Sequence, residues 1–95
     1  MPIIAKLVST TGAVRHVTLP DDPSDQEIID ALGGEVGDDY TWLGQANGYE
    51  VLRLNNGSND KIVIGDPPQN SAPIKQRLSC TISDANAAKL AKSFP

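Results

Sequence analysis

The sequence predicts an α+β domain in which helices pack on one face of a mostly antiparallel sheet. Three observations lead to this class: short β-rich runs bounded by turn residues, two segments of helical spacing that begin at serines, and a chain of 95 residues. That length fits one domain, so residues 1–95 are treated as a single unit. The expected order of elements is ββαβββ, an extended loop, and then βα.

The first two β-rich runs predict an antiparallel hairpin. Apolar side chains occupy almost every position of 3–8, which is typical of a strand buried on both faces. A Ser-Thr-Thr-Gly turn at 9–12 separates this strand from a second run over 14–19. Pro20 then ends the hairpin.

A short helix is predicted directly after the hairpin. Ser24 and Glu27 have the spacing of a capping box, and apolar residues follow within one turn. Gly33 and Gly34 stop the helix. At about eight residues it is too short to be stable alone, so it must pack on the sheet.

The opening of the chain is similar to a known layout. A hairpin followed by a Pro-Ser-Asp helix start at 23–25 resembles the ubiquitin-like β-grasp arrangement over about the first 33 residues. The chain ends in Ser93-Phe94-Pro95 and not in the Gly-Gly tail that carrier proteins of that family use for conjugation. We therefore expect a β-grasp-like N-terminal half without carrier chemistry.

A three-stranded meander is predicted in the middle of the chain. The β-rich runs 40–46 and 49–54 flank Asn47-Gly48, which is a strong hairpin signal. A polar turn leads from there to a third strand over 61–64.

The last third predicts a loop, a strand and a helix. Three prolines in 65–73 indicate an irregular segment, and alternating apolar residues over 74–82 predict a half-buried strand. Ser83 is the expected cap of a final helix. Its apolar stripe consists of Ala87, Leu90, Ala91 and Phe94.

The charges are unevenly distributed along the chain. The net charge is −4, and no lysine or arginine lies between Arg15 and Arg53. That stretch holds nine acids, namely Asp21, Asp22, Asp25, Glu27, Asp30, Glu35, Asp38, Asp39 and Glu50. One reading is a solvated face that keeps the protein soluble, and the other is an acidic patch that steers a basic partner. Direct nucleic-acid binding is disfavoured, because there is no basic stripe with interleaved aromatics.

The charge pattern favours a non-enzymatic protein-binding module. Its partner would be a protein with a basic groove, and the module could inhibit that partner by occupying a surface meant for nucleic acid, by analogy with phage-encoded inhibitors of host defence. Aromatic side chains beside charge make good anchors. The expected binding residues are Asp21, Asp22, Asp25, Glu27, Asp30, Glu35, Asp38, Asp39, Tyr40 and Trp42.

Two alternatives remain open. The acidic middle and the more basic C-terminal third could meet between subunits and give a homodimer or a larger self-assembling protein. The start Met1-Pro2-Ile3-Ile4 resembles that of the tautomerase family, in which an N-terminal proline acts as base or nucleophile. That family has a long helix after its first strand, whereas a turn and a second strand are expected here.

Other chemistry is not indicated by the residues. His16 is the only histidine and Cys80 the only cysteine, which leaves no clustered ligands for a metal and no sign of a cofactor. We interpret His16 as an ordinary strand residue and Cys80 as a buried thiol. No signal peptide or membrane-spanning run is visible, so a cytoplasmic protein without membrane contact is expected.

Overall fold

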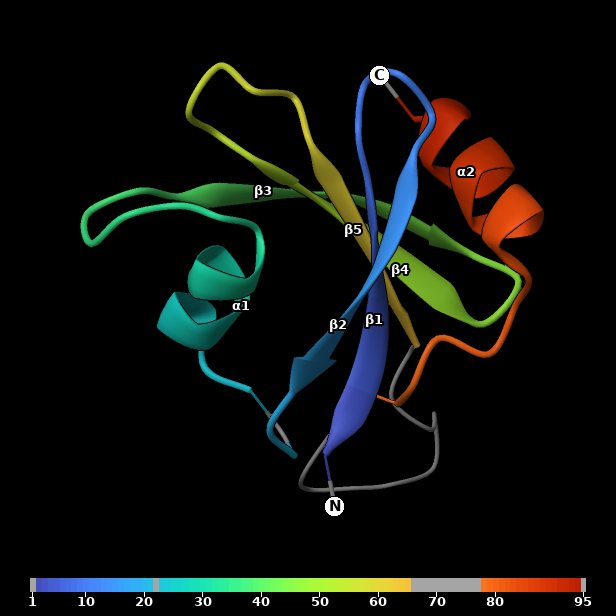
Figure 1. The fold of residues 1–95 in the computed structure, drawn as a ribbon, viewed down its shortest axis with the longest axis horizontal. Coiled ribbons are helices and arrows are strands. Elements are labelled where there is room, and N and C mark those ends of the chain that lie inside the picture. The colour runs from blue at the N-terminus through green and yellow to red at the C-terminus, as the bar shows by residue number, and fades with distance from the viewer. Residues whose placement is uncertain (1, 22, 66–77, 95) are drawn as a thin grey trace.

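The computed structural model describes residues 2–21, 23–65 and 78–94 (Figure 1). These residues form a twisted sheet with a helix at either side of it. The elements are β1 (Ile3–Val8), β2 (Val14–Leu19), α1 (Asp25–Ala31), β3 (Tyr40–Ala46), β4 (Tyr49–Leu54), β5 (Lys61–Gly65) and α2 (Asp84–Lys92). The expected α+β class, the opening ββα order and the meander are confirmed.

The sheet has five strands in the order β2-β1-β5-β4-β3, and every pairing is antiparallel. β1 lies inside the sheet, where it pairs with β2 on one side and β5 on the other. β2 and β3 are therefore the two edge strands. Asn47 and Gly48 both have positive φ, 56° and 83°, as a tight turn between β3 and β4 requires.

The two helices cover opposite faces of the sheet, which corrects the expectation that both would pack on one face. Ala5 and Ile62 belong to the larger apolar cluster, together with Ile28 of α1. Val63 belongs to the second cluster, together with Ala87 of α2. Successive strand residues point to opposite faces, so each apolar face of the central strands needs its own cover.

Local signals account for α1. The Ser24 side chain accepts a hydrogen bond from the Glu27 amide, and the Glu27 carboxylate accepts one from the Ser24 amide, which completes the predicted capping box. Ile28 and Ile29 point into the larger cluster. Gly33 follows the helix with a φ of 84°, a conformation that suits glycine.

α2 is capped by Ser83, whose side chain accepts a hydrogen bond from the Asn86 amide. Ala87 and Ala91 are buried against the sheet, and the predicted apolar stripe is confirmed. The small side chains let the helix lie close to the strands.

The predicted strand over 74–82 is only partly testable, because 66–77 lie outside the described residues. Leu78 forms a single antiparallel bridge with Gly65, and the following residues are irregular. The Cys80 amide donates to the Ile4 carbonyl at 2.7 Å, which holds this segment beside β1. The strand prediction is therefore wrong for 79–82, where these isolated contacts replace a continuous ladder.

Candidate interaction surface

Six carboxylates lie on α1 and on the loop that joins it to β3, and we call them the acidic flank. Five are exposed, and Asp38 is half-buried. The members are Asp25, Glu27, Asp30, Glu35, Asp38 and Asp39. In Figure 1 this part of the chain lies on the side of the sheet away from α2.

Several members of the flank stabilise local structure. Glu27 belongs to the capping box, and Asp30 accepts a hydrogen bond from the Gln26 amide group at 2.9 Å. Asp38 accepts one from the Glu35 backbone at 2.8 Å, which shapes the loop after α1. These donors are neutral, so they do not offset the charge of the flank.

The flank is not neutralised from within the described chain. None of its six carboxylates forms an ion pair with a lysine or arginine of the described ranges; the ion pairs found there join Asp84 to Lys6 and to His16. Like charges therefore accumulate at one side of an acidic protein. Such a cluster produces a negative electrostatic potential that can steer a positively charged partner.

An aromatic pair adjoins the flank. The Tyr40 hydroxyl donates a hydrogen bond to Asp25 at 2.6 Å, which ties the start of β3 to the first turn of α1. Trp42 follows two residues later, and its cross-strand partner Leu52 lies in the same cluster as Leu54, the partner of Tyr40. The two aromatics therefore share one face of β3, about 7 Å apart.

Trp42 is the more available of the two aromatics. It is 53% exposed, whereas Tyr40 is half-buried against the larger cluster. A large apolar side chain that stays open to solvent beside charged groups is a candidate contact anchor.

One expected binding residue, Asp21, and one other acid of the same stretch, Glu50, lie outside this surface. Asp21 lies in the bend after β2 and has interactions of its own. Asp22 is not among the described residues. Glu50 is 6% exposed and points from β4 toward the face that α1 covers, so it is not available for docking.

An ionic cluster, of which only Lys6 is buried, joins α2 to the N-terminal hairpin. Lys6 is 7% exposed, and its ammonium donates to the Ile82 carbonyl and lies 3.0 Å from Asp84. Asp84 also lies 2.8 Å from the His16 Nε2. Hydrogen bonds from His16, and next from Lys6, hold the pKa of Asp84 below its usual value.

The sequence pattern did not reveal this cluster, because its members are far apart along the chain. His16, interpreted as an ordinary strand residue, contributes to holding α2. Cys80 is buried, as expected, and desolvation raises the pKa of its thiol, which disfavours the reactive thiolate.

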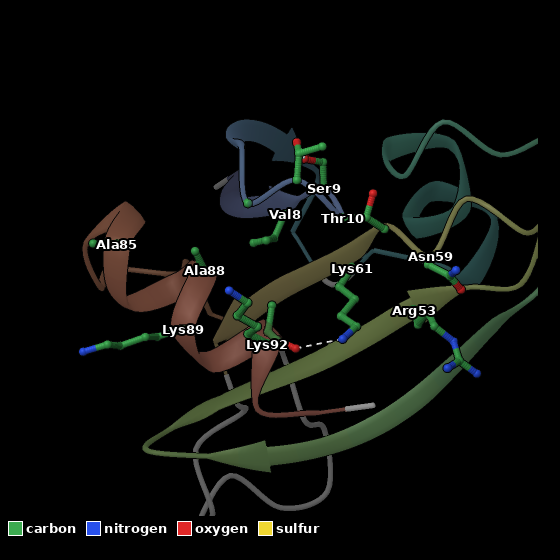
Figure 2. Close-up of a pocket in the computed structure, with 13 residues that line it drawn as sticks. Val8, Ser9, Thr10, Arg53, Asn59, Lys61, Ala85, Ala88, Lys89 and Lys92 are labelled. Carbon is green, nitrogen blue, oxygen red and sulfur yellow. Dashed lines mark hydrogen bonds between the residues drawn. The ribbon is translucent and has the colours of Figure 1, made fainter.

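A hollow that no pattern in the sequence indicates lies between α2 and the turns β1–β2 and β4–β5 (Figure 2). It has a volume of about 400 Å³. Its basic residues are Arg53, Lys61, Lys89 and Lys92. We call it the basic hollow.

Pro2 lies in a different setting from the one the tautomerase resemblance implies. It is exposed and immediately precedes β1, which continues through a turn into the antiparallel strand β2. That family has a long helix at the corresponding position of the chain.

Comparison with models of known protein families, with curated proteins and with solved structures finds no match to this chain. Neither described helix is long and apolar enough to cross a bilayer. Within the described ranges, no three His, Cys, Asp or Glu side chains come close enough together to hold a metal ion. The candidate surface therefore rests on geometry and charge alone.

Proposed function

We propose that this protein is a non-enzymatic binding module that docks its acidic flank onto a basic groove of a partner protein. The single observation that carries the proposal is the concentration of six carboxylates, without ion pairs to described basic residues, beside the half-exposed Trp42. A module of this kind would inhibit a partner whose groove normally receives nucleic acid.

The two parts of the surface have different roles in this proposal. Clustered charge mainly accelerates association and selects a complementary partner. Trp42 would supply the desolvated apolar contact that slows dissociation, because aromatic side chains dominate the energetics of many interfaces. The flank is accordingly expected to control the association rate, and Trp42 the dissociation rate.

The test uses the full chain as immobilised bait in an extract of its source cells, followed by rate measurements with the purified captured protein. The double variant Glu35→Gln/Asp39→Asn removes two carboxylates that accept no hydrogen bond from the described residues. We expect it to lower the association rate about tenfold at low salt, and we expect the wild-type rate to fall steeply as salt is added.

Asp60→Asn is the matched control, because Asp60 lies in a loop outside the flank and its side chain makes no described hydrogen bond. This variant should bind like the wild type. Because Asp60→Asn removes one charge, it is compared with the single variant Asp39→Asn, which should lower the association rate part of the way toward the double variant. Equal effects of Asp39→Asn and Asp60→Asn, or an association rate that does not change with salt, would refute the proposed docking surface. Trp42→Ala should accelerate dissociation without changing the salt dependence.

Self-association is a second candidate, favoured by the opposed charges of the molecule. The acidic flank includes residues of α1, which covers one face of the sheet. The basic hollow lies beside α2, which covers the other face. One copy could therefore place its flank against the hollow of the next copy. Sedimentation velocity at low salt tests this: a species heavier than the monomer that dissociates in salt supports it, and a monomer at high concentration contradicts it.

A further inference from the structure

We propose that the basic hollow is a binding site for a small organic phosphate, a dianion with an apolar body. This inference is independent of the acidic flank, which lies on the opposite face of the sheet. It rests on the composition of the walls, on the fixed position of Lys61, and on the direction in which Lys92 extends.

The composition of the hollow differs from that of the protein. The chain has eight Lys and Arg against twelve Asp and Glu, yet four of the 13 residues that line the hollow are basic. None of the described lining residues is acidic. Basic residues are therefore over-represented in the lining of one concave site of a net acidic chain, which favours an anionic ligand.

Lys61 is held in place at one wall. Its ammonium donates to the Ala91 carbonyl at 2.9 Å and to the Phe94 carbonyl at 2.6 Å, so it caps the C-terminal end of α2. An ammonium has three donors, and these carbonyls use two of them. Desolvation, and then the charge of Arg53, lower the pKa of Lys61, and a bound anion would offset both effects.

Arg53 and Lys61 are cross-strand partners on β4 and β5, so they lie on the same face of the sheet. Lys92 belongs to the last turn of α2 and, as Figure 2 shows, extends across the space between the helix and the strands. A doubly charged phosphate can accept hydrogen bonds from several such donors at once, which a single carboxylate does less well.

The remaining walls suit the organic part of such a ligand. Val8, Ala88 and Ala91 give an apolar surface, while Thr10 and Asn59 offer polar groups at the opposite rim. No described lining residue is aromatic, so the hollow has no platform for stacking a nucleobase. A volume of about 400 Å³ lies within the range of small-molecule sites. These features favour a compact phosphate monoester over a nucleotide.

The experiment is a titration of the full, isotope-labelled chain with phenyl phosphate at low ionic strength, followed by amide chemical shifts. Inorganic phosphate and phenol serve as probes of the two halves of the ligand. We expect saturable shifts at the β1–β2 turn and along α2, strongest with phenyl phosphate, weaker with inorganic phosphate and absent with phenol.

Lys92→Gln and Lys89→Gln form a matched pair, since both remove one charge from an exposed position of the same helix. In Figure 2 the Lys92 side chain lies on the side of α2 that faces the strands, whereas Lys89 points away from the strands. We expect Lys92→Gln to weaken phenyl phosphate binding about tenfold, as loss of a charge-assisted hydrogen bond does. Lys89→Gln should weaken it less than about twofold, as for an exposed charge.

Three results would overturn the proposal. Absence of saturable shifts in the hollow would show that it takes no phosphate monoester. Equal effects of the two lysine variants would reduce the binding to general attraction by net charge, and equal binding of phenol would make the hollow an apolar site. The flank variant Glu35→Gln/Asp39→Asn should bind phenyl phosphate like the wild type, so this site and the proposed docking function can fail separately.

Discussion

The contact between Gly44 and Phe94 gives a quantitative test of how the C-terminus packs on the sheet. Gly44 lies at the bulge of the edge strand β3 and has a φ of 153°. A Cβ atom built there would lie 2.5 Å from the Phe94 Cε1, too close for any real contact. Gly44→Ala therefore has two costs, one in the backbone and one in the displacement of the ring.

The expected magnitudes follow from the geometry. A non-glycine residue in an unfavourable backbone conformation costs about 1–3 kcal/mol. Phe94 is half-buried, so Phe94→Ala should cost about 1.5–2.5 kcal/mol, roughly half of the value for a fully buried phenylalanine. If the alanine displaces the ring, Gly44→Ala loses a similar amount in addition and costs about 2.5–5.5 kcal/mol in total. The whole free energy of unfolding is about 5–14 kcal/mol for a chain of this size.

The assay is a double-mutant cycle measured by urea unfolding, with far-UV circular dichroism and the fluorescence of Trp42, the only tryptophan, as probes. Once Phe94→Ala has removed the ring, Gly44→Ala should retain only its backbone cost. The sum of the two single effects counts the loss of the ring twice. The double variant should therefore be more stable than that sum predicts, by about 1.5–2.5 kcal/mol.

Gly48→Ala is the control for the backbone part. Gly48 has a φ of 83°, and an added Cβ would meet nothing within 4 Å. Its cost should be the same with and without Phe94. Additivity of Gly44→Ala and Phe94→Ala within about 0.5 kcal/mol would refute the inferred clash.

Three further predictions concern stability and reactivity. Because its folded-state pKa is lowered, Asp84 should stabilise the fold above its unfolded pKa near 4 and lose that contribution as the pH falls through the folded value. The difference in unfolding free energy between the wild type and Asp84→Asn should then shrink in acid, and a difference that grows there would contradict the assignment. Cys80 should react slowly with iodoacetamide at neutral pH in the native protein and rapidly in denaturant, because burial raises its pKa; rapid native labelling would show that the thiol is accessible. Ser24→Ala should lower the unfolding free energy by about 1 kcal/mol, measured by urea titration, whereas no change would mean that the capping box does not contribute to stability.

Local signals in the sequence were sufficient for much of the fold. The bounds 14–19, 40–46 and 49–54 agree with β2, β3 and β4, because Gly, Asn and Pro at their ends act over a few residues. Both serine caps were also found in this way, since a cap depends on neighbours within one turn. The concentration of acids before β3 is likewise a property of consecutive residues.

Contacts between distant segments were decided only by the tertiary structure. The strand order, the placement of one helix on each face and the meeting of Lys6 with Asp84 depend on which apolar surfaces bury one another, and no local pattern encodes that choice. The same holds for the basic hollow, whose residues come from turns and a helix separated along the chain. The distribution of charges along the chain can be read from the sequence alone. A site requires side chains from distant segments to come together, and the packing of the whole core determines which ones do.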